Sequence, residues 1–253
     1  MKVIGRIMTV METFKPKNEQ TRPDTDNEAT TKKFWDERAE RAGSWRAEGQ
    51  PHSFFTTFLN QHRQELGKEA IDIGCGRGIY VVPLAEQGFH VHGVDISQNM
   101  LKLTKGEVVK RDLNSVDLVN ASTRQLPFSD QSMDFAISFG VLYFNDWTGI
   151  NESFDEVNRV LRPGQYFMMQ VRSANNTERE RTKIEDTPGG FISVSPDDPH
   201  GVRIHYFSRD GLITLGNQHG FDIVQGPIED GAQDADRASR RRWWVVFKKK
   251  LQE

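Results

Sequence analysis

A glycine-rich turn and an aspartate that follows it are the residues of this sequence best suited to chemistry. Residues 70–78 read Ala-Ile-Asp-Ile-Gly-Cys-Gly-Arg-Gly, and the next apolar run ends at Asp95. Glycines let a backbone approach a ligand closely, and a carboxylate at the end of the neighbouring strand can accept hydrogen bonds from both hydroxyls of a ribose. The pattern predicts a site for an adenosine-containing cofactor on a parallel α/β sheet.

The spacing of the glycines separates two classes of cofactor. A dinucleotide site has the pattern G-x-G-x-x-G, with the third glycine where the helix packs on the strand. Here the glycines are Gly74, Gly76 and Gly78, and Ile79 follows directly. This G-x-G-x-G turn, preceded by Asp72, resembles the first motif of class I S-adenosylmethionine-dependent methyltransferases. A nicotinamide-dependent oxidoreductase is therefore disfavoured.

Four later segments extend the resemblance over about residues 70–250. Residues 121–128 are similar to the third motif of the family, although many members carry an Asp where this chain has Ser122. Residues 132–144 resemble its fourth-strand motif, and 161–165 and 205–212 match further landmarks. The resemblance implies S-adenosylmethionine as cofactor, S-adenosylhomocysteine as product, and methyl transfer by in-line displacement.

The resemblance also implies which residues hold the cofactor. Backbone groups of the glycine turn would bind the amino-acid tail, Asp95 the ribose, and the segment at Ser122 and Thr123 the adenine. The hydroxyl of Ser122 would be a weaker acceptor than the usual carboxylate, and the alternative is that Ser122 and Thr123 are ordinary turn residues. The expected cofactor residues are Asp72, Gly74, Gly76, Gly78, Asp95, Ile96, Ser122, Thr123, Phe139 and Gly140.

Aromatic and titratable residues near the expected strand ends are candidates for the acceptor site. Tyr143 and His205 are the candidate catalytic residues, because both could handle a proton. The residues expected to bind the substrate are Trp35, His200, Arg203 and Tyr206. Each could instead serve only in packing. Cys75 is the single cysteine, which excludes a cysteine metal site, and we expect no metal.

Regularly alternating elements must position these residues. Apolar runs predict strands at about 70–73, 89–94, 116–120, 134–139 and 165–171, with two more from residue 221 and at about 242–249, and helices lie between them. This pattern predicts an α/β fold with a doubly wound, mostly parallel seven-stranded sheet. Such sheets bind ligands beyond the carboxyl ends of their strands.

The rest of the chain is expected to decorate one methyltransferase domain, residues 31–253. We expect residues 1–30 to form a flexible tail, because residues 15–30 have almost no apolar side chains to bury. Two helices over 31–66 form a helical cap. Periodicity fades over 172–204, after the fifth strand, which predicts a substrate-lid insertion.

Composition limits the choice of partner. The net charge is −3, and no apolar run approaches the roughly 20 residues of a membrane helix. We expect a cytoplasmic enzyme, a monomer or homodimer without membrane or nucleic-acid partners, that methylates oxygen or nitrogen of a small molecule.

Two alternatives remain open. A tRNA- or protein-modifying enzyme is suggested by a basic C-terminus with aromatic residues in it, although a final strand with a solvated charged end explains the same residues. That segment contains Arg237, Arg240, Arg241, Arg242, Trp243, Trp244, Lys248, Lys249 and Lys250. A protein that binds the cofactor without an acceptor is the other alternative.

Overall fold

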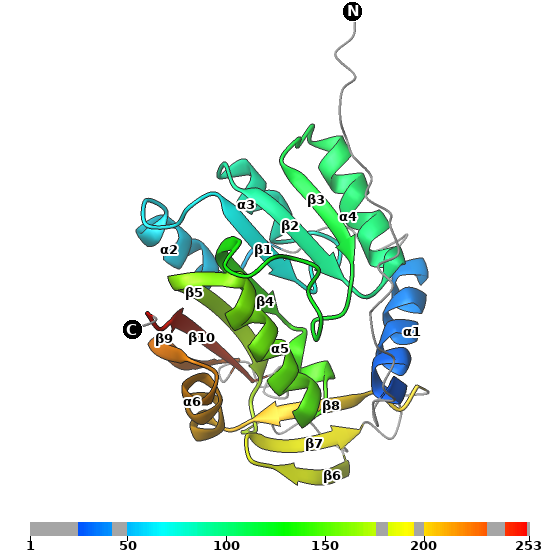
Figure 1. The fold of residues 1–253 in the computed structure, drawn as a ribbon. Helices are drawn as coiled ribbons and strands as arrows, with labels where there is room; N and C mark the ends of the chain where they lie inside the picture. The colour runs from blue at the N-terminus through cyan, green and yellow to red at the C-terminus, as the bar shows by residue number, and fades with distance from the viewer. Residues whose placement is uncertain (1–24, 42–49, 176–181, 195–199, 232–240, 252–253) are drawn as a thin grey trace, which may run out of the picture.

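The computed structural model describes residues 25–41, 50–175, 182–194, 200–231 and 241–251. Its centre is a seven-stranded sheet in the order β3-β2-β1-β4-β5-β10-β9, with helices on both faces (Figure 1). This confirms the α/β, doubly wound fold. The strands of this sheet are β1 (Glu69–Ile73), β2 (His90–Asp95), β3 (Val116–Asn120), β4 (Met133–Phe139), β5 (Leu161–Arg172), β9 (Phe221–Asp230) and β10 (Arg242–Lys249).

Apolar residues cover both faces of the sheet, as the near-continuous hydrophobic runs of its inner strands require. On one face, Phe58, Leu84 and Leu101 bring their helices against β1 and β4. On the other face, Phe154 and Leu215 belong to a second core cluster. The helices are α2 (Ser53–His62), α3 (Val81–Glu86) and α4 (Gln98–Lys110) on the first face, and α5 (Trp147–Val160) and α6 (Arg209–Gln218) on the second.

The strand order reverses beside β1. Residues of β1 pair in parallel with β2 on one side, at Asp72 and Gly93, and with β4 on the other, at Asp72 and Ile137. The connections from β1 to β2 and from β4 to β5 then run in opposite directions across the sheet. A crevice forms beyond the carboxyl ends of the strands at such a point, and this is where ligands bind in open α/β sheets.

The last strand accounts for the aromatic residues of the basic C-terminal segment. Antiparallel β10 is paired on both edges, with β5 and β9, and most of its side chains are buried. Trp243 and Trp244 are only 6% and 3% exposed, and the Lys249 ammonium donates to the carbonyls of Asn158 and Leu161 at 2.6 and 2.8 Å. The aromatic residues are therefore core residues. Arg237 and Arg240 lie outside the described residues.

The N-terminal helix is longer than the sequence predicts. Helix α1 runs over Thr25–Arg41, so residues 25–30, expected in the flexible tail, are helical. Their composition is polar, but Asn27 donates to the carbonyl of Phe144 at 3.0 Å, and Glu28 accepts from Ser122 at 2.9 Å. These long-range hydrogen bonds order a segment that lacks apolar residues. The tail at 1–24 is outside the described residues.

Part of the expected lid is a small antiparallel sheet. Strands β6 (Thr182–Thr187), β7 (Gly190–Val194) and β8 (Arg203–Phe207) pair in the order β6-β7-β8. Residues 176–181 and 195–199 of the insertion are not described. The small sheet lies below α5 in Figure 1, beyond the end of β5 and near one end of α1. The described helices include none that is both long and apolar enough to span a membrane.

Candidate active site

A cavity of about 450 Å³ lies at the carboxyl ends of β1, β2 and β4, with α1 along one side. Nine of the ten expected cofactor residues line it, and so does Trp35. The exception is Gly78, where φ is +84° and an added Cβ would come within 2.9 Å of Thr104. Gly78 therefore serves the turn and the packing of α4 rather than the cavity wall. The lining residues from the predicted set are Asp72, Gly74, Gly76, Asp95, Ile96, Ser122, Thr123, Phe139 and Gly140.

Hydrogen bonds to the end of β2 fix the glycine turn. The amides of Gly74 and Cys75 both donate to the carbonyl of Val94, at 2.7 and 2.9 Å. Gly74 has φ +76°, and an added Cβ would lie 2.2 Å from Val141, so this position requires glycine. The backbone of the turn consequently lies against the cavity.

Asp95 connects this turn to the next helix. Its Oδ2 accepts from the amide of Gly76 and its Oδ1 from the amide of Ser97, each at 2.8 Å. Burial raises the pKa of Asp95, and these two hydrogen bonds oppose the shift. Each carboxylate oxygen has a second lone pair, so the same group can also accept from a ligand. The same side chain therefore lines the cavity and holds the residue at the start of α4.

Asp72 presents a buried carboxyl group to the cavity. It is 2% exposed, and its Oδ2 has no hydrogen-bond partner in the described structure. Burial, and secondly the charge of Asp95, raise the pKa of Asp72 to about 8. Burying a carboxylate without a partner is costly, so this site is suited to a ligand that brings a cation.

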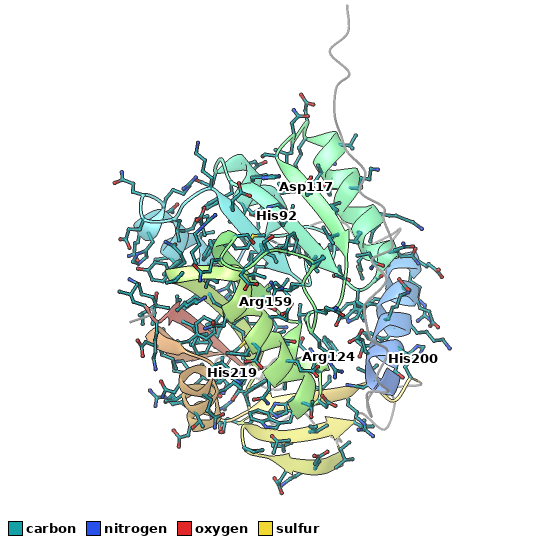
Figure 2. All side chains as sticks on the ribbon, viewed as in Figure 1. His92, Asp117, Arg124, Arg159, His200 and His219 are labelled. Atoms are coloured by element: carbon teal, nitrogen blue, oxygen red, sulfur yellow. The ribbon has the colours of Figure 1, made fainter. Side chains whose placement is uncertain are left out.

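A carboxylate from α1 lies beside Ser122, the position where many members of the family carry an aspartate. Ser122 donates from its hydroxyl to Glu28 Oε2 at 2.9 Å, and both residues line the cavity. The hydroxyl of Ser122 also accepts from the amide of Arg124 at 3.1 Å. Arg124 in turn donates to Glu152 on α5 at 2.5 Å, which fixes this loop (Figure 2). Glu28 was missed because it is 94 residues away in sequence.

Helix α1 supplies an aromatic wall. The rings of Trp35 and Phe144 meet edge to face with centroids 5.4 Å apart, and both residues line the cavity. Asp36 holds the helix to α4 by accepting from Ser97 at 2.6 Å. Several polar or charged lining residues were not among the expected site residues: Glu28, Thr31, Arg38, Tyr80, Asn145 and Arg242.

His205 does not occupy the position expected of a catalytic base. It is completely buried on β8, bonds through Nε2 to the hydroxyl of Thr187 at 2.7 Å, and stacks on Trp147. Burial lowers the pKa of His205 to about 3. It is not among the cavity-lining residues, so the prediction of a proton acceptor at the methyl group is wrong.

Tyr143 lies behind the cavity wall. It belongs to η2 (Leu142–Phe144), is buried in the core, and is not a lining residue. A Cβ added at Gly140 would lie 3.7 Å from its hydroxyl oxygen, so the phenol lies beside this cavity-lining residue without lining the cavity itself. Its neighbour Phe144 takes the lining position instead.

Three of the four expected substrate residues also lie away from the cavity lining. His200 pairs with Glu37 of α1 at 3.2 Å and packs its ring on Phe34, as its position beside α1 in Figure 2 shows. Arg203 is exposed at the start of β8, and Tyr206 is 2% exposed and stacks on Phe191. Of the four, Trp35 lines the cavity as expected, whereas Tyr206 is buried with the rest of β8 beyond Arg203.

A second hollow, more open and of about 480 Å³, lies between α5, the end of α6 and β10. Its polar side chains bind one another: Arg159 pairs with Glu156 and Asp130, and His219 with Asp155 (Figure 2). It lies away from the carboxyl ends of the parallel strands, so the chemistry is assigned to the first cavity.

Comparisons with known proteins agree with this geometry. Residues 71–169 match the family model of the methyltransferase domain. Demethylmenaquinone methyltransferases from Geobacillus stearothermophilus and Listeria monocytogenes are 38% identical over 103 residues and 35% identical over 106 residues. These matches cover 39% and 40% of this chain, and only 42% and 44% of the two relatives.

Solved structures show the same fold over most of the chain. A methyltransferase from Methanosarcina mazei superposes with a TM-score of 0.65 at 23% identity, covering 81% of this chain and 100% of the other. The 1,6-didemethyltoxoflavin-N1-methyltransferase of Burkholderia thailandensis, solved with its substrate and S-adenosylhomocysteine, has a TM-score of 0.70 at 17% identity, covering 93% and 94%.

The fold and the glycine turn, together with these matches, define a class. Residues 71–169 match the methyltransferase-domain family, and over most of its length the chain has the fold of S-adenosylmethionine-dependent methyltransferases, as the sequence motifs indicated.

Proposed function

We propose that the protein transfers a methyl group from S-adenosylmethionine to oxygen or nitrogen of a small-molecule acceptor. The observation that carries the proposal is the arrangement of two buried acids, Asp72 and Asp95, on either side of the glycine turn and within one cavity. This cofactor combines a cationic amino-acid tail, a ribose diol and an adenine, and the cavity offers a matching group for each.

The tail of the cofactor would lie at the end of β1. Its ammonium group fits the carboxyl of Asp72, which has one oxygen without a hydrogen-bond partner in the described structure. Arg242 of β10 lines the same cavity and brings a positive charge suited to the tail carboxylate. The amides of Gly74 and Gly76 already donate within the protein, so the turn would offer carbonyl oxygens to the ammonium group.

The nucleoside would lie toward β2 and α1. Asp95 would accept from the ribose hydroxyls while its amide bonds hold it in place. Glu28, supported by Ser122, offers a carboxylate to the exocyclic amine of adenine. The chain thereby uses its N-terminal helix for a contact that the loop after β3 supplies in many relatives.

Methyl transfer from a sulfonium needs alignment more than acid–base chemistry. The sulfur leaves as a neutral thioether, so the protein has to hold nucleophile, methyl and sulfur in line and exclude water. Burial raises the pKa of Tyr80 to about 12, so this phenol stays neutral and can donate a hydrogen bond. Such a site suits an acceptor that is nucleophilic by itself, such as a neutral amine or an acidic phenol.

The aromatic wall favours a flat acceptor. Trp35 and Phe144 offer ring surfaces on the α1 side, and Asn145 adds an amide next to them. The relatives and the Burkholderia neighbour are named for a quinone and a fused heterocycle. We infer an acceptor with a planar ring, held against these residues while its nucleophilic atom faces the methyl group.

Calorimetry with S-adenosylmethionine tests the cofactor assignment. Asp95→Ala should weaken binding at least about tenfold, or about 1.4 kcal/mol. Asp222→Ala, which removes an exposed acid from β9, is the matched control and should bind like the wild type. Equal affinity in Asp95→Ala and the wild type would refute the ribose assignment.

Release of S-adenosylhomocysteine tests the reaction. Phenols, hydroxyquinones and heterocyclic amines are offered with the cofactor, and turnover with at least one of these classes is expected. Tight cofactor binding without turnover on the panel or on cell extracts would favour a cofactor-binding sensor. A salt-sensitive gel shift with bulk tRNA would favour the RNA-modifying alternative instead.

A further inference from the structure

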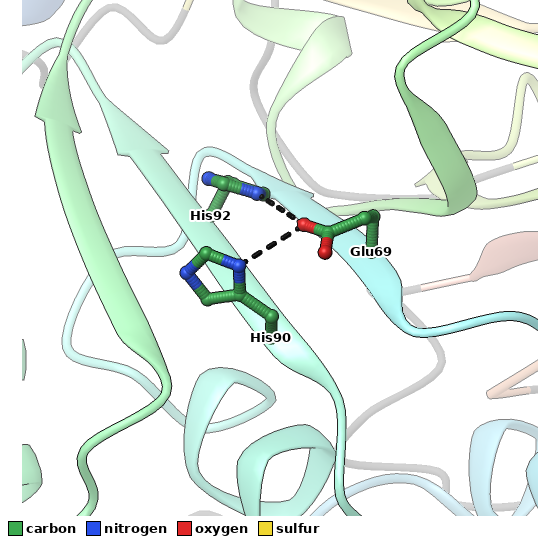
Figure 3. Close-up of side chains that lie close together, drawn as sticks. All are labelled: Glu69, His90 and His92. Atoms are coloured by element: carbon green, nitrogen blue, oxygen red, sulfur yellow. Dashed lines mark hydrogen bonds and ion pairs between the residues drawn. The ribbon is translucent and has the colours of Figure 1, made fainter.

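A cluster of histidines and acids lies at the other end of the strands from the cavity. Glu69 begins β1, His90 and His92 lie two residues apart on β2, and Asp117 lies on β3. The register places Glu69 beside His90 and His92 beside Asp117. Side chains two residues apart on a strand share a face, so all four meet on one face of the sheet (Figures 2 and 3).

Three ligand atoms of this cluster converge. Glu69 Oε2 lies 2.9 Å from His92 Nε2 and 3.1 Å from His90 Nδ1, as the dashed lines in Figure 3 show. These three atoms all lie within 4.8 Å of one another. Asp117 Oδ2 approaches the opposite nitrogen of His90, Nε2, at 2.8 Å.

The geometry of these contacts favours a cation between them. A neutral imidazole has one N–H, but both nitrogens of His90 face carboxylate oxygens, so one of the two contacts lacks a hydrogen. A cation between Nδ1 of His90 and Glu69 would satisfy that contact. It would also explain why His92 Nε2 is directed at the same oxygen of Glu69.

We propose that Glu69, His90 and His92 bind a divalent transition-metal ion of the Zn²⁺ type, and that Asp117 orients His90 through its other nitrogen. Two imidazoles and a carboxylate are a ligand set suited to such an ion, and a carboxylate that accepts from the far nitrogen of a ligating histidine is its usual support. Ligand atoms around a tetrahedral Zn²⁺ lie about 3.3 Å apart, so the observed contacts need only open slightly.

The site is accessible and joins three strands. His92 is 13% exposed in its side chain, whereas His90 is 40% and Glu69 36% exposed, so an ion can enter and keep a water ligand. The ion would connect β1 to β2 and, through Asp117, the edge strand β3. Its expected effect is on stability, and it does not depend on the proposed methyl transfer.

Metal titration of the full chain tests the site. After dialysis against a chelator, Zn²⁺ is followed by calorimetry and Co²⁺ by its visible absorption. Binding should saturate at one equivalent, His92→Gln and Glu69→Gln should abolish that saturable binding, and Asp117→Asn should weaken it about 10- to 100-fold. His62→Gln removes a comparable histidine that pairs with Glu65 on another surface, and it should bind like the wild type.

Two readouts decide against the proposal. Absence of saturable binding of either metal would overturn it, as would binding that His92→Gln leaves unchanged. The ring nitrogen signals of His90 and His92 in NMR would then be unaffected by Zn²⁺. Circular dichroism and S-adenosylmethionine affinity of each variant establish that the fold is intact, so a lost metal site is not confused with unfolding.

Discussion

The buried carboxyl of Asp72 predicts that cofactor binding releases a proton. In the free protein, burial and the charge of Asp95 raise the pKa of Asp72 to about 8, so at pH 7 the group is mostly neutral. An ion pair with the ammonium of S-adenosylmethionine requires the ionised form. Binding below pH 8 therefore has to drive off the proton, and affinity rises with pH.

The size of the effect follows from the pKa. Each pH unit below 8 lowers the ionised fraction about tenfold, so affinity should rise roughly 20-fold between pH 6 and 7.5. About 0.9 proton should leave for each cofactor bound at pH 7. S-adenosylhomocysteine keeps the ammonium and should behave in the same way, whereas 5′-methylthioadenosine lacks the tail and should bind without this pH dependence.

Calorimetry in two buffers of different ionisation enthalpy counts the released protons directly. Asp72→Asn keeps the shape of the side chain but cannot ionise, so its cofactor affinity should lose the pH dependence. Wild-type protein that binds without releasing protons would refute the reasoning, and so would an Asp72→Asn variant with the same slope against pH.

Stability provides an independent check on Asp72. Its folded pKa lies above the unfolded value of about 3.9, so the folded state is penalised progressively as pH rises from about 4 to 8. Asp72→Asn removes that penalty, so the variant's gain in free energy of unfolding should be small at pH 4 and largest near pH 8. A gain that stayed constant across this range would contradict burial of an ionisable group.

Two other predictions concern residues that the structure reassigns. Glu28→Gln should weaken S-adenosylhomocysteine binding about tenfold, in line with the loss of a charge-assisted hydrogen bond. In a competition assay it should also narrow the difference in affinity between S-adenosylhomocysteine and its inosine analogue. An unchanged difference would exclude Glu28 from the adenine contact. His205→Gln should leave the shape of the pH–rate profile unchanged. It should lower the unfolding temperature by about 2–4 °C for each kcal/mol of stability lost, because His205 is a buried partner of Thr187. Loss of one limb of the profile would instead show that His205 acts as a catalytic base.

Local patterns made the cofactor side of the site predictable. The glycine turn, Asp95 and the Phe139–Gly140 strand end are each set by neighbours within a few residues, because strand ends and tight turns have strong residue preferences. The structure places all of them on the cavity apart from Gly78. The seven-stranded fold follows from the same alternation of strands and helices.

Contacts between distant segments could not be predicted in this way. Nothing in residues 25–30 indicates that Glu28 meets Ser122, because the partner is 94 positions away. The position of His205 could not be predicted for another reason: β8 is buried on both faces beyond Arg203, so it shows no alternation that would separate His205 from cavity residues. The His-x-His pair at 90–92 did carry a signal, since strand periodicity puts both rings on one face.

The double attachment of Asp95 means that the site is organised before any ligand arrives. Its two oxygens are already held by the amides of Gly76 and Ser97, so the carboxylate and the glycine turn lose their freedom when the chain folds. Association then needs less ordering of this region, which favours affinity at little entropic cost. The same double role restricts substitution of Asp95, since a residue that suited a different sugar would also release the glycine turn.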